Sequence, residues 1–388
     1  MFKIQTLNPI AIKGLDQFPK ELYEVGIAIN QPDAILVRSQ DMHTLTLPAS
    51  VKIIGRAGAG VNNIPIDQFT KTGIPVLNTP GANANAVREL VIAGMLLASR
   101  NLSRGWKYVC ELAGSDAEIH KQVEKDKKQF VGFELFGKTL GVVGLGNIGV
   151  KVANAALGFG MNVIGYDPTI TVHRAWELSS SVKQARDLDQ LLKESDFITF
   201  HIPFNLETKH LINADKLRLM KSGVVLLNLA RDGIIDEDAL EAVLNEKKVF
   251  AYVTDFPSAL LKNHPAVIGL PHLGASTIEA EENCAMMIVK QIRDFLENGS
   301  ISNSVNFPTV EIPQFNGGTR LAIVNKNIPN MVAQISSDLG KAGLNITSLI
   351  NKSRDDIAYT VVDVNDEVSE QIIKEIKGIA GVVQVRRI

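Results

Sequence analysis

Cysteine is nearly absent from this chain, and its scarcity narrows the classes of protein to which the chain can belong. The only two cysteines, Cys110 and Cys284, lie far apart and form no Cys-x-x-Cys pair. Small secreted domains depend on several disulfides, so two distant thiols favour a reducing compartment such as the cytoplasm. Histidines and carboxylates show no zinc-site spacing either, and we expect no metal.

Long apolar runs and an excess of one charge are also missing. The longest apolar run, from Leu90 to Ser99, is far too short to span a membrane. The first residues, 1–6, lack the apolar core of an export signal, which again predicts a cytoplasmic protein. A net charge of −2 gives no electrostatic reason to expect a nucleic acid or a membrane as partner.

A glycine-rich turn lies between a predicted strand and a predicted helix in the middle of the chain. The apolar run 139–143 leads into Gly144, Gly146 and Gly149, and apolar residues then recur at helical spacing. Asp167 closes the next apolar run, 18 residues after Gly149. This order is typical of a dinucleotide-binding unit, with the pyrophosphate at the helix N-terminus. Since Asp167 can bond ribose hydroxyls and repels a 2′-phosphate, we expect NAD as cofactor.

The rest of the chain alternates predicted strands and helices, which indicates a parallel α/β architecture. About 140 residues precede the glycine turn, enough for a domain of their own. Two prolines and two glycines within 306–318 mark a boundary, and the last 70 or so residues show the pattern β-α-β-β-α-β of a ferredoxin-like unit. Residues 86–109 form one long amphipathic stretch.

Polar side chains follow three later strands, where an α/β sheet holds its ligands. Arg231 comes after the run 224–228, and its guanidinium can grip a carboxylate with two hydrogen bonds. Asp255 follows the run 249–253, and His272 lies on a loop between a proline and a glycine. Oxidation of a secondary alcohol needs a nicotinamide, a base and a cation, and the glycine turn, His272 and Arg231 supply one each.

Six segments together resemble the D-2-hydroxyacid dehydrogenase family, and within it the phosphoglycerate branch that carries a C-terminal ACT domain. They are residues 55–64, 78–80, 144–149, 228–236, 271–277 and 305–308. The resemblance implies two doubly wound parallel-sheet domains: an NAD-binding domain, 89–283, inserted into a discontinuous substrate domain, 1–88 and 284–310. A linker, 311–318, would join an ACT-like domain, 319–388.

The resemblance also implies a reaction and its residues. The chain would oxidise 3-phospho-D-glycerate to 3-phosphohydroxypyruvate with NAD, the first step of L-serine biosynthesis. Arg231 would bind the substrate carboxylate and carbonyl, His272 would act as acid and base, and Arg56 would lie near the phosphate. The loop after Arg56 would contact the substrate through Ala57, Gly58, Ala59 and Gly60. The NAD site would comprise Thr79, Gly144, Gly146, Asn147, Ile148, Gly149, Asp167, Ala230, Asp255, Gly274 and Ala275.

Two departures from the family pattern stand out. The family usually pairs its catalytic histidine with a glutamate, but Ala259 occupies that position and the preceding aspartate is displaced by one residue, to Asp255. We hypothesise that Asp255 contacts the nicotinamide amide or partly replaces the glutamate. In the ACT-like domain, Asn325 stands for the usual histidine and Asn330 for the usual glycine.

Several alternatives stay open at this point. Asn325, Asn327 and Asn345 keep amides that can hold an amino-acid effector such as L-serine, or the ACT-like domain only associates with another copy. The enzyme can instead be a reductase of unphosphorylated 2-keto acids such as glyoxylate or hydroxypyruvate. A protein of another class, an NAD-sensing corepressor, can keep the same motifs. Two candidate surfaces, the helix from Ala86 and the ACT sheet, predict a homodimer or homotetramer.

Overall fold

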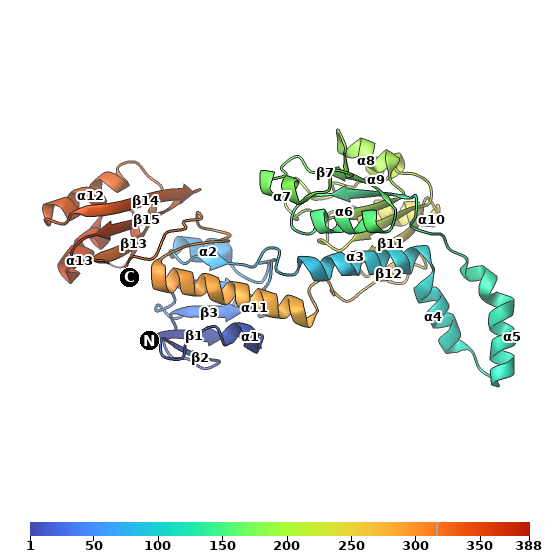
Figure 1. The fold of residues 1–388 in the computed structure, drawn as a ribbon, viewed down its shortest axis with the longest axis horizontal. Helices are drawn as coiled ribbons and strands as arrows, with labels where there is room; N and C mark the ends of the chain where they lie inside the picture. The colour runs from blue at the N-terminus through green and yellow to red at the C-terminus, as the bar shows by residue number, and fades with distance from the viewer. Residues whose placement is uncertain (316) are drawn as a thin grey trace. The chain divides into compact units, whose positions relative to one another are not determined.

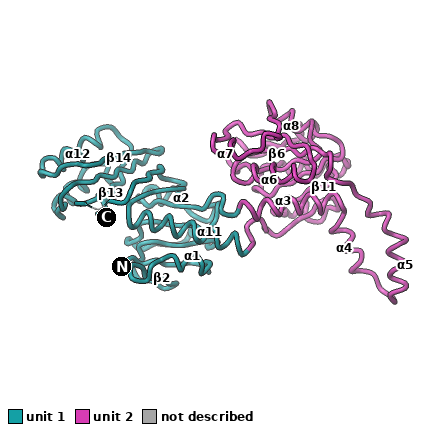
Figure 2. Tube along the Cα trace, viewed as in Figure 1, with its two compact units in different colours: residues 1–83, 278–388 teal, residues 84–277 magenta. Residues whose placement is uncertain are grey.

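The computed structural model describes residues 1–315 and 317–388, which form two compact units (Figure 2). Unit 1 comprises residues 1–83 and 278–388, and unit 2 comprises residues 84–277. The boundaries fall at the starts of helices α3 (Ala84–Ser99) and α11 (Ile278–Arg293), beside the sequence-based boundaries at 88/89 and 283/284. The α/β fold class, with two parallel sheets and a separate antiparallel one, is confirmed.

Unit 1 contains a parallel sheet with the strand order β2-β1-β3-β4-β5, of which β1, β2 and β3 are labelled in Figure 1. Its strands are β1 (Phe2–Thr6), β2 (Tyr23–Gly26), β3 (Ala34–Val37), β4 (Ile53–Arg56) and β5 (Val76–Leu77). Its helices are α1 (Ile12–Leu15), α2 (Ile66–Lys71) and α11, which continues into a π-helical turn, Asp294–Asn298. Gly299, in the left-handed conformation, ends this helix.

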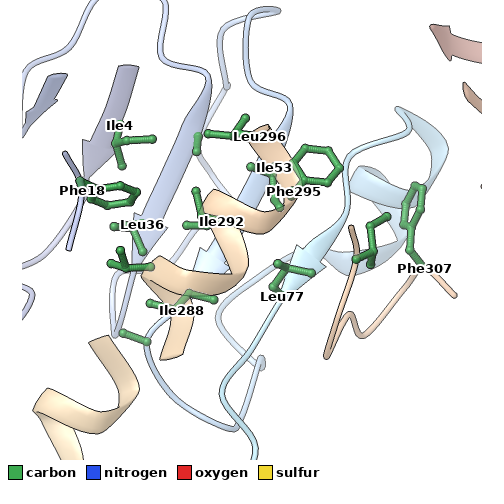
Figure 3. Close-up of a cluster of buried hydrophobic side chains, with 14 of the residues drawn as sticks. Ile4, Phe18, Leu36, Ile53, Leu77, Ile288, Ile292, Phe295, Leu296 and Phe307 are labelled. Carbon is green, nitrogen blue, oxygen red and sulfur yellow. The ribbon is translucent and has the colours of Figure 1, made fainter. Parts of the chain in front are cut away.

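Helix α11 supplies much of the core of unit 1 (Figure 3). Its Ile288 and Ile292 are fully buried with Ile53 of β4. A Cβ atom on Gly55 would come within 2.6 Å of Ile292 Cδ1 and 2.7 Å of Ile288 Cγ1. Glycine at this position therefore lets the helix lie directly on the strand.

The segment around Asn306 completes the same sheet at its edge. Ser304 forms an antiparallel bridge with Leu77, and the buried Asn306 side chain accepts a hydrogen bond from Val76 N at 2.8 Å. The same side chain donates to Ile74 O and to Thr70 Oγ1. An asparagine here satisfies backbone groups that a two-residue strand leaves unpaired.

The C-terminal part of unit 1 is the expected βαββαβ unit. It consists of β13 (Thr319–Lys326), α12 (Met331–Lys341), β14 (Ile346–Arg354), β15 (Ile357–Val364), α13 (Glu370–Gly378) and β16 (Val382–Arg387). The strand order is β14-β15-β13-β16, and all three pairings are antiparallel. Every residue of β15 is buried, so both faces of this sheet are covered.

Unit 2 is built on a seven-stranded parallel sheet with helices on both faces. Its strands are β6 (Thr139–Val143), β7 (Asn162–Tyr166), β8 (Lys183–Gln184), β9 (Phe197–Phe200), β10 (Val224–Asn228), β11 (Val249–Thr254) and β12 (Val267–Gly269). One face packs on α3 and α6 (Gly149–Gly158), and the other on α8 (Leu188–Glu194), α9 (Ala214–Leu219) and α10 (Glu237–Asn245). A short helix, α7 (Val172–Glu177), follows β7.

The stretch 86–109, which the sequence shows as one amphipathic segment, is divided between two helices. Helix α3 ends at Ser99, and α4 (Leu102–Glu111) begins after Asn101, whose φ of 50° is left-handed. No residue of α4 or of α5 (Asp116–Asp126) is buried, and in Figure 1 both helices project away from the sheet of unit 2. Trp106 on α4 is 74% exposed. No helix within residues 1–315 and 317–388 has the length and apolar character needed to cross a membrane.

Candidate active site

The carboxyl ends of the parallel strands of unit 2 gather most of the predicted site residues. The strand order is β12-β11-β10-β9-β6-β7-β8, so the direction of the chain across the sheet reverses between β6 and β9. Such a switch point is where open α/β sheets bind ligands. The glycine turn follows β6, Asp167 follows β7, and Arg231 follows β10.

The glycine turn has the shape that a pyrophosphate needs. Gly144 has a φ of 91°, and a Cβ atom on Gly149 would lie 1.9 Å from Gly144 O, so both positions require glycine. A Cβ atom on Gly146 would meet nothing within 4 Å. The protein itself gives no steric reason for this glycine, and the open space above it fits the close approach of a dinucleotide to the backbone. Asn147 and Ile148 complete the turn before α6.

Asp167 is fixed against the glycine turn by hydrogen bonds. One carboxylate oxygen accepts from the backbone N of Leu145 at 2.8 Å, and the other accepts from the N of Thr169 at 2.8 Å. The carboxylate therefore lies beside the turn with its charge half-exposed. This is the arrangement that favours a ribose with free hydroxyls over a 2′-phosphate.

Arg231 lies on the loop after β10, and hydrogen bonds to neighbouring residues fix its position. Asn228 Nδ2 donates to Arg231 O at 2.9 Å, and the Arg231 guanidinium donates to Ala230 O at 2.6 Å. Burial lowers the pKa of the Arg231 guanidinium, and the charge of Asp255 opposes that shift. A half-buried cation beside a carboxylate can bind an anionic ligand strongly because little water screens it.

Asp255 connects the loop after β11 to the loop that carries His272. One Asp255 oxygen accepts from Gly274 N at 3.1 Å, and His272 N donates to Asp255 O at 3.1 Å. The other carboxylate oxygen is buried without a hydrogen-bond partner. Burial raises the pKa of Asp255, and Gly274 N, His272 and Arg231 oppose that shift. Asp255 thus sits between the two groups assigned to catalysis.

His272 is exposed on its loop and has a left-handed φ of 50°. Its ring packs at 4.8 Å between centroids on the ring of Phe256. The charge of this ring interacts with that of the buried Asp255. Ala275 follows Gly274 in the same loop.

His201, directly after β9, is a half-buried histidine beside the glycine turn. Its carbonyl lies against Gly144, since a Cβ atom there would be 2.7 Å from His201 O. Burial lowers the pKa of His201 to about 3, so its ring is neutral at physiological pH. Nε2 lies 3.1 Å from Thr199 Oγ1, and Nδ1 has no partner.

In unit 1, the loops after β4 and β5 carry the residues predicted to contact the substrate, 56–60, and the predicted NAD-site residue Thr79. Arg56 ends β4, and a Cβ atom on Gly58 would lie 2.5 Å from its Nη1, so the guanidinium covers this glycine. Thr79 N donates to Gly58 O at 3.1 Å, and Asn78 Nδ2 donates to Ala59 O at 2.6 Å. The loop carrying Ala57, Ala59 and Gly60 is thereby tied to the end of β5.

Arg38 is a cation at the same edge that sequence reasoning missed. It follows β3, and Arg56 Nε donates to its carbonyl oxygen at 3.1 Å. Its guanidinium forms an ion pair with Glu281 of α11 at 2.8 Å. Burial raises the pKa of the nearby Cys284 thiol, while Thr79, Arg38 and Arg56 lower it. The available signal was its place directly after an apolar strand, the same signal that identified Arg231.

The βαββαβ part of unit 1, residues 319–388, is called the C-terminal unit from here on. It contains a pocket of about 440 Å³ beside the start of α12. Asn325 and Asn327 line it, together with Asn351 and Ala358. Asn345 is exposed directly before β14 and does not line the pocket, whereas Asn351, on β14, does. Within the described residues no group of histidine, cysteine and carboxylate side chains could hold a metal ion.

Comparison with known proteins relates this geometry to a family. The model of the NAD-binding domain of D-isomer specific 2-hydroxyacid dehydrogenases matches residues 92–274. A D-3-phosphoglycerate dehydrogenase of Haemophilus influenzae is 31% identical over 399 residues, covering 99% of this chain and 93% of that protein. One of Methanocaldococcus jannaschii is 36% identical over 354 residues and 86% of this chain, but this chain spans only 65% of its length. The solved NAD⁺-bound 3-phosphoglycerate dehydrogenase of Entamoeba histolytica superposes with a TM-score of 0.60, at 29% identity over 79% of this chain and 98% of that one.

Proposed function

This chain belongs to the family of D-isomer specific 2-hydroxyacid dehydrogenases, and on that premise we propose that it oxidises 3-phospho-D-glycerate to 3-phosphohydroxypyruvate with NAD⁺. The observation that carries the proposal is the set of groups at the strand ends. The glycine turn and Asp167 suit NAD, while Arg231 and His272 lie on the loops after β10 and β12, with Asp255 after the intervening β11. Arg56 and Arg38, in unit 1, supply positive charge for a phosphate.

The roles of the residues follow from their charges and positions. When bound, NAD⁺ supplies the hydride acceptor. Arg231 holds the substrate carboxylate and polarises the carbon–oxygen bond that becomes the carbonyl. His272 takes up the proton of the substrate hydroxyl, since an imidazole is the usual proton carrier near neutral pH. The Gly274 amide, held by Asp255, fixes the loop on which His272 lies.

A comparison of substrates tests the proposal and isolates the phosphate. We expect turnover of NAD⁺ with 3-phospho-D-glycerate, with a KM at least about tenfold below that for D-glycerate, because each charge-assisted hydrogen bond contributes about 1.5–3 kcal/mol. Replacing Arg38 with glutamine should raise the KM for 3-phospho-D-glycerate about tenfold and leave that for D-glycerate unchanged. Steady-state kinetics measure both effects.

Three other outcomes would contradict this assignment. Equal KM values for the two acids would remove the phosphate from recognition. Faster NADH-dependent reduction of glyoxylate than of 3-phosphohydroxypyruvate would favour a reductase of unphosphorylated keto acids. NADH binding without turnover of any of these acids would favour an NAD-sensing corepressor.

We further propose that Asp255 partly replaces the glutamate missing at position 259. Its burial, its unpartnered oxygen and its place between Arg231 and His272 support this role. A carboxylate that is kept buried and charged beside a base stabilises the protonated form of that base. The same burial makes Asp255 costly to the folded state.

Asp255→Asn separates these two effects. Because the pKa of Asp255 is raised in the folded state, the folded protein holds this proton more tightly than the unfolded chain does. The contribution of Asp255 to the free energy of unfolding therefore falls as the pH rises from the unfolded pKa to the folded pKa, and it is lowest above the folded pKa. The variant should therefore be more stable than the wild type at pH 7, with the difference vanishing as the pH falls towards the unfolded value of 3.8. We expect kcat/KM to fall about tenfold or more and the acid limb of its pH profile to move.

Chemical denaturation and pH–rate profiles measure the two effects independently. Asp232→Asn, at an exposed position in the loop after Arg231, serves as the matched control. If Asp255→Asn left both the NADH affinity and the acid limb unchanged, Asp255 would have no part in the site.

We propose that the pocket of the C-terminal unit binds an amino-acid effector such as L-serine. Its side-chain amides, from Asn325, Asn327 and Asn351, can hold both a carboxylate and an amino group. L-Serine should then raise the thermal midpoint by mass action and alter activity, and Asn351→Ala should abolish both responses while Asn345→Ala keeps them. Flat titrations of activity and thermal midpoint would leave the unit with a purely structural role.

We also propose that the chain forms a homodimer or homotetramer. The exposed apolar side chains of the α4 helix and of the segment after α5 support this, namely Leu102, Trp106, Val109 and Val131. Sedimentation velocity should show an oligomer, and Trp106→Glu should shift it towards monomer. A monomeric wild-type protein would contradict the proposal.

A further inference from the structure

The carboxyl end of helix α11 is held by side chains from the C-terminal unit. The last carbonyl groups of a helix have no partner within the helix and need other donors. Here Arg386 donates to Phe295 O at 2.6 Å and to Leu296 O at 3.2 Å. Arg320 donates to Asn298 O at 3.1 Å, and the Tyr359 hydroxyl donates to Gly299 O at 2.8 Å. Two cations at a helix C-terminus also complement its dipole.

Arg320 and Tyr359 are buried and Arg386 is half-buried, which distinguishes the contact from a chance meeting of surfaces. The Arg386 guanidinium lies over the Phe295 ring at 4.1 Å, and burial lowers its pKa. Arg320 is only 3% exposed and forms a two-pronged ion pair with Asp363, at 2.6 and 2.7 Å. Because a buried charge is tolerated only with partners, the carbonyls of α11 are part of what allows these arginines to be buried.

Apolar side chains extend the same contact. One face of the C-terminal sheet belongs to the same hydrophobic cluster as the end of α11 and Phe307. Its members on the sheet are Ala322, Val324, Ile357, Tyr359 and Val361. The helices α12 and α13 pack on the opposite face, around Leu321 and Ile323. Over β13 and β15, the face without helices is therefore covered by the end of α11 and by Phe307, while most residues of β14 are exposed.

The body of α11 supports the two cations assigned to the phosphate. Glu281, in its first turn, holds the Arg38 guanidinium at 2.8 Å. Ile288 and Ile292 pack on Gly55, the residue that precedes Arg56. A displacement of α11 along its axis would therefore move Arg38 directly and Arg56 through β4.

We propose that the C-terminal unit acts as a clamp on its own chain: Arg386, Arg320 and Tyr359 fix the carboxyl end of α11, and α11 in turn positions Arg38 and Arg56 for an anionic substrate. The three clamp residues are positioning residues, since none lies at the substrate loops. The role of Arg38 and Arg56 in this statement rests on the proposed function, whereas the clamp itself rests on the contacts with α11.

Strand β15 connects the pocket of the C-terminal unit to the carboxyl end of α11. On β15, Ala358 lines the pocket, and Thr360 donates to Asn325 Oδ1 at 3.1 Å and accepts from Asn351 Nδ2 at 2.7 Å. Tyr359, between them, points to the opposite face because side chains alternate along a strand. A ligand that shifts β15 at the pocket therefore also shifts the hydroxyl group bonded to Gly299 O.

The test uses the 388-residue chain and three variants of it. Arg386→Ala removes the main donor, Tyr359→Phe removes a single hydroxyl, and Arg387→Ala is the matched control. Arg387 lies on the same strand, and its partners among the described residues, Val368 O, Glu367 and Glu370, belong to the C-terminal unit itself. The readouts are hydrogen exchange of the amides at 294–300, the KM and kcat for 3-phospho-D-glycerate, and NADH affinity by fluorescence.

The clamp predicts a specific pattern among these readouts. Exchange at 294–300 should accelerate about tenfold or more in Arg386→Ala and less in Tyr359→Phe, because a hydrogen bond from a charged donor contributes more than one from a neutral donor. The KM should rise severalfold in both variants, with kcat and NADH affinity unchanged, and Arg387→Ala should match the wild type throughout. If Arg386→Ala fails to fold, Tyr359→Phe alone decides.

Two results would overturn the clamp. One is unchanged exchange at 294–300 in Tyr359→Phe and Arg386→Ala. The other is a loss of kcat and NADH affinity in parallel with KM, which would indicate general destabilisation. A wrong substrate assignment would give a different result from a wrong clamp. The wild type and Arg387→Ala would then also lack turnover of 3-phospho-D-glycerate, while the differences in hydrogen exchange at 294–300 would persist.

Discussion

The packing of helix α11 on strand β4 is the contact on which the rest of unit 1 depends. It is possible because residue 55 is a glycine, so that Ile288 and Ile292 reach the backbone of the strand. This close approach buries a continuous apolar core and fixes the position of β4, the strand that ends in Arg56. The first turn of the same helix holds Arg38, and its last turn meets Arg320 and Arg386 of the C-terminal unit.

In unit 2 the comparable constraint is the burial of charge at the strand ends. Asp255 is almost fully buried with one oxygen unpartnered, and the half-buried Arg231 lies close enough for their charges to interact. Such an arrangement costs the folded state stability, since desolvated charges are poorly compensated. Active sites keep this kind of cost because the same desolvation strengthens their interaction with a charged ligand.

Much of the fold could be predicted because its signals are local. The glycine turn, the acid after β7 and the βαββαβ order are each written in consecutive residues with fixed spacing. The break between α3 and α4 was missed, because the apolar spacing continues across it and only the left-handed Asn101 marks the change of direction. The β-α-β-β-α-β pattern did not indicate that both faces of β13 are covered, with Leu321 and Ile323 on one face and Ala322 and Val324 on the other.

By itself the sequence determined the cofactor-binding turn, the fold class and the cations and histidine after the strands, since each depends on residue type and short spacing. Only the tertiary structure decided which groups meet. Arg38 lies next to Arg56, Asp255 reaches Gly274, Asn351 rather than Asn345 lines the pocket, and Arg386 caps a helix that ends nearly ninety residues earlier. These contacts join segments far apart in the chain, and their geometry is set by how helices and sheets pack rather than by any local pattern.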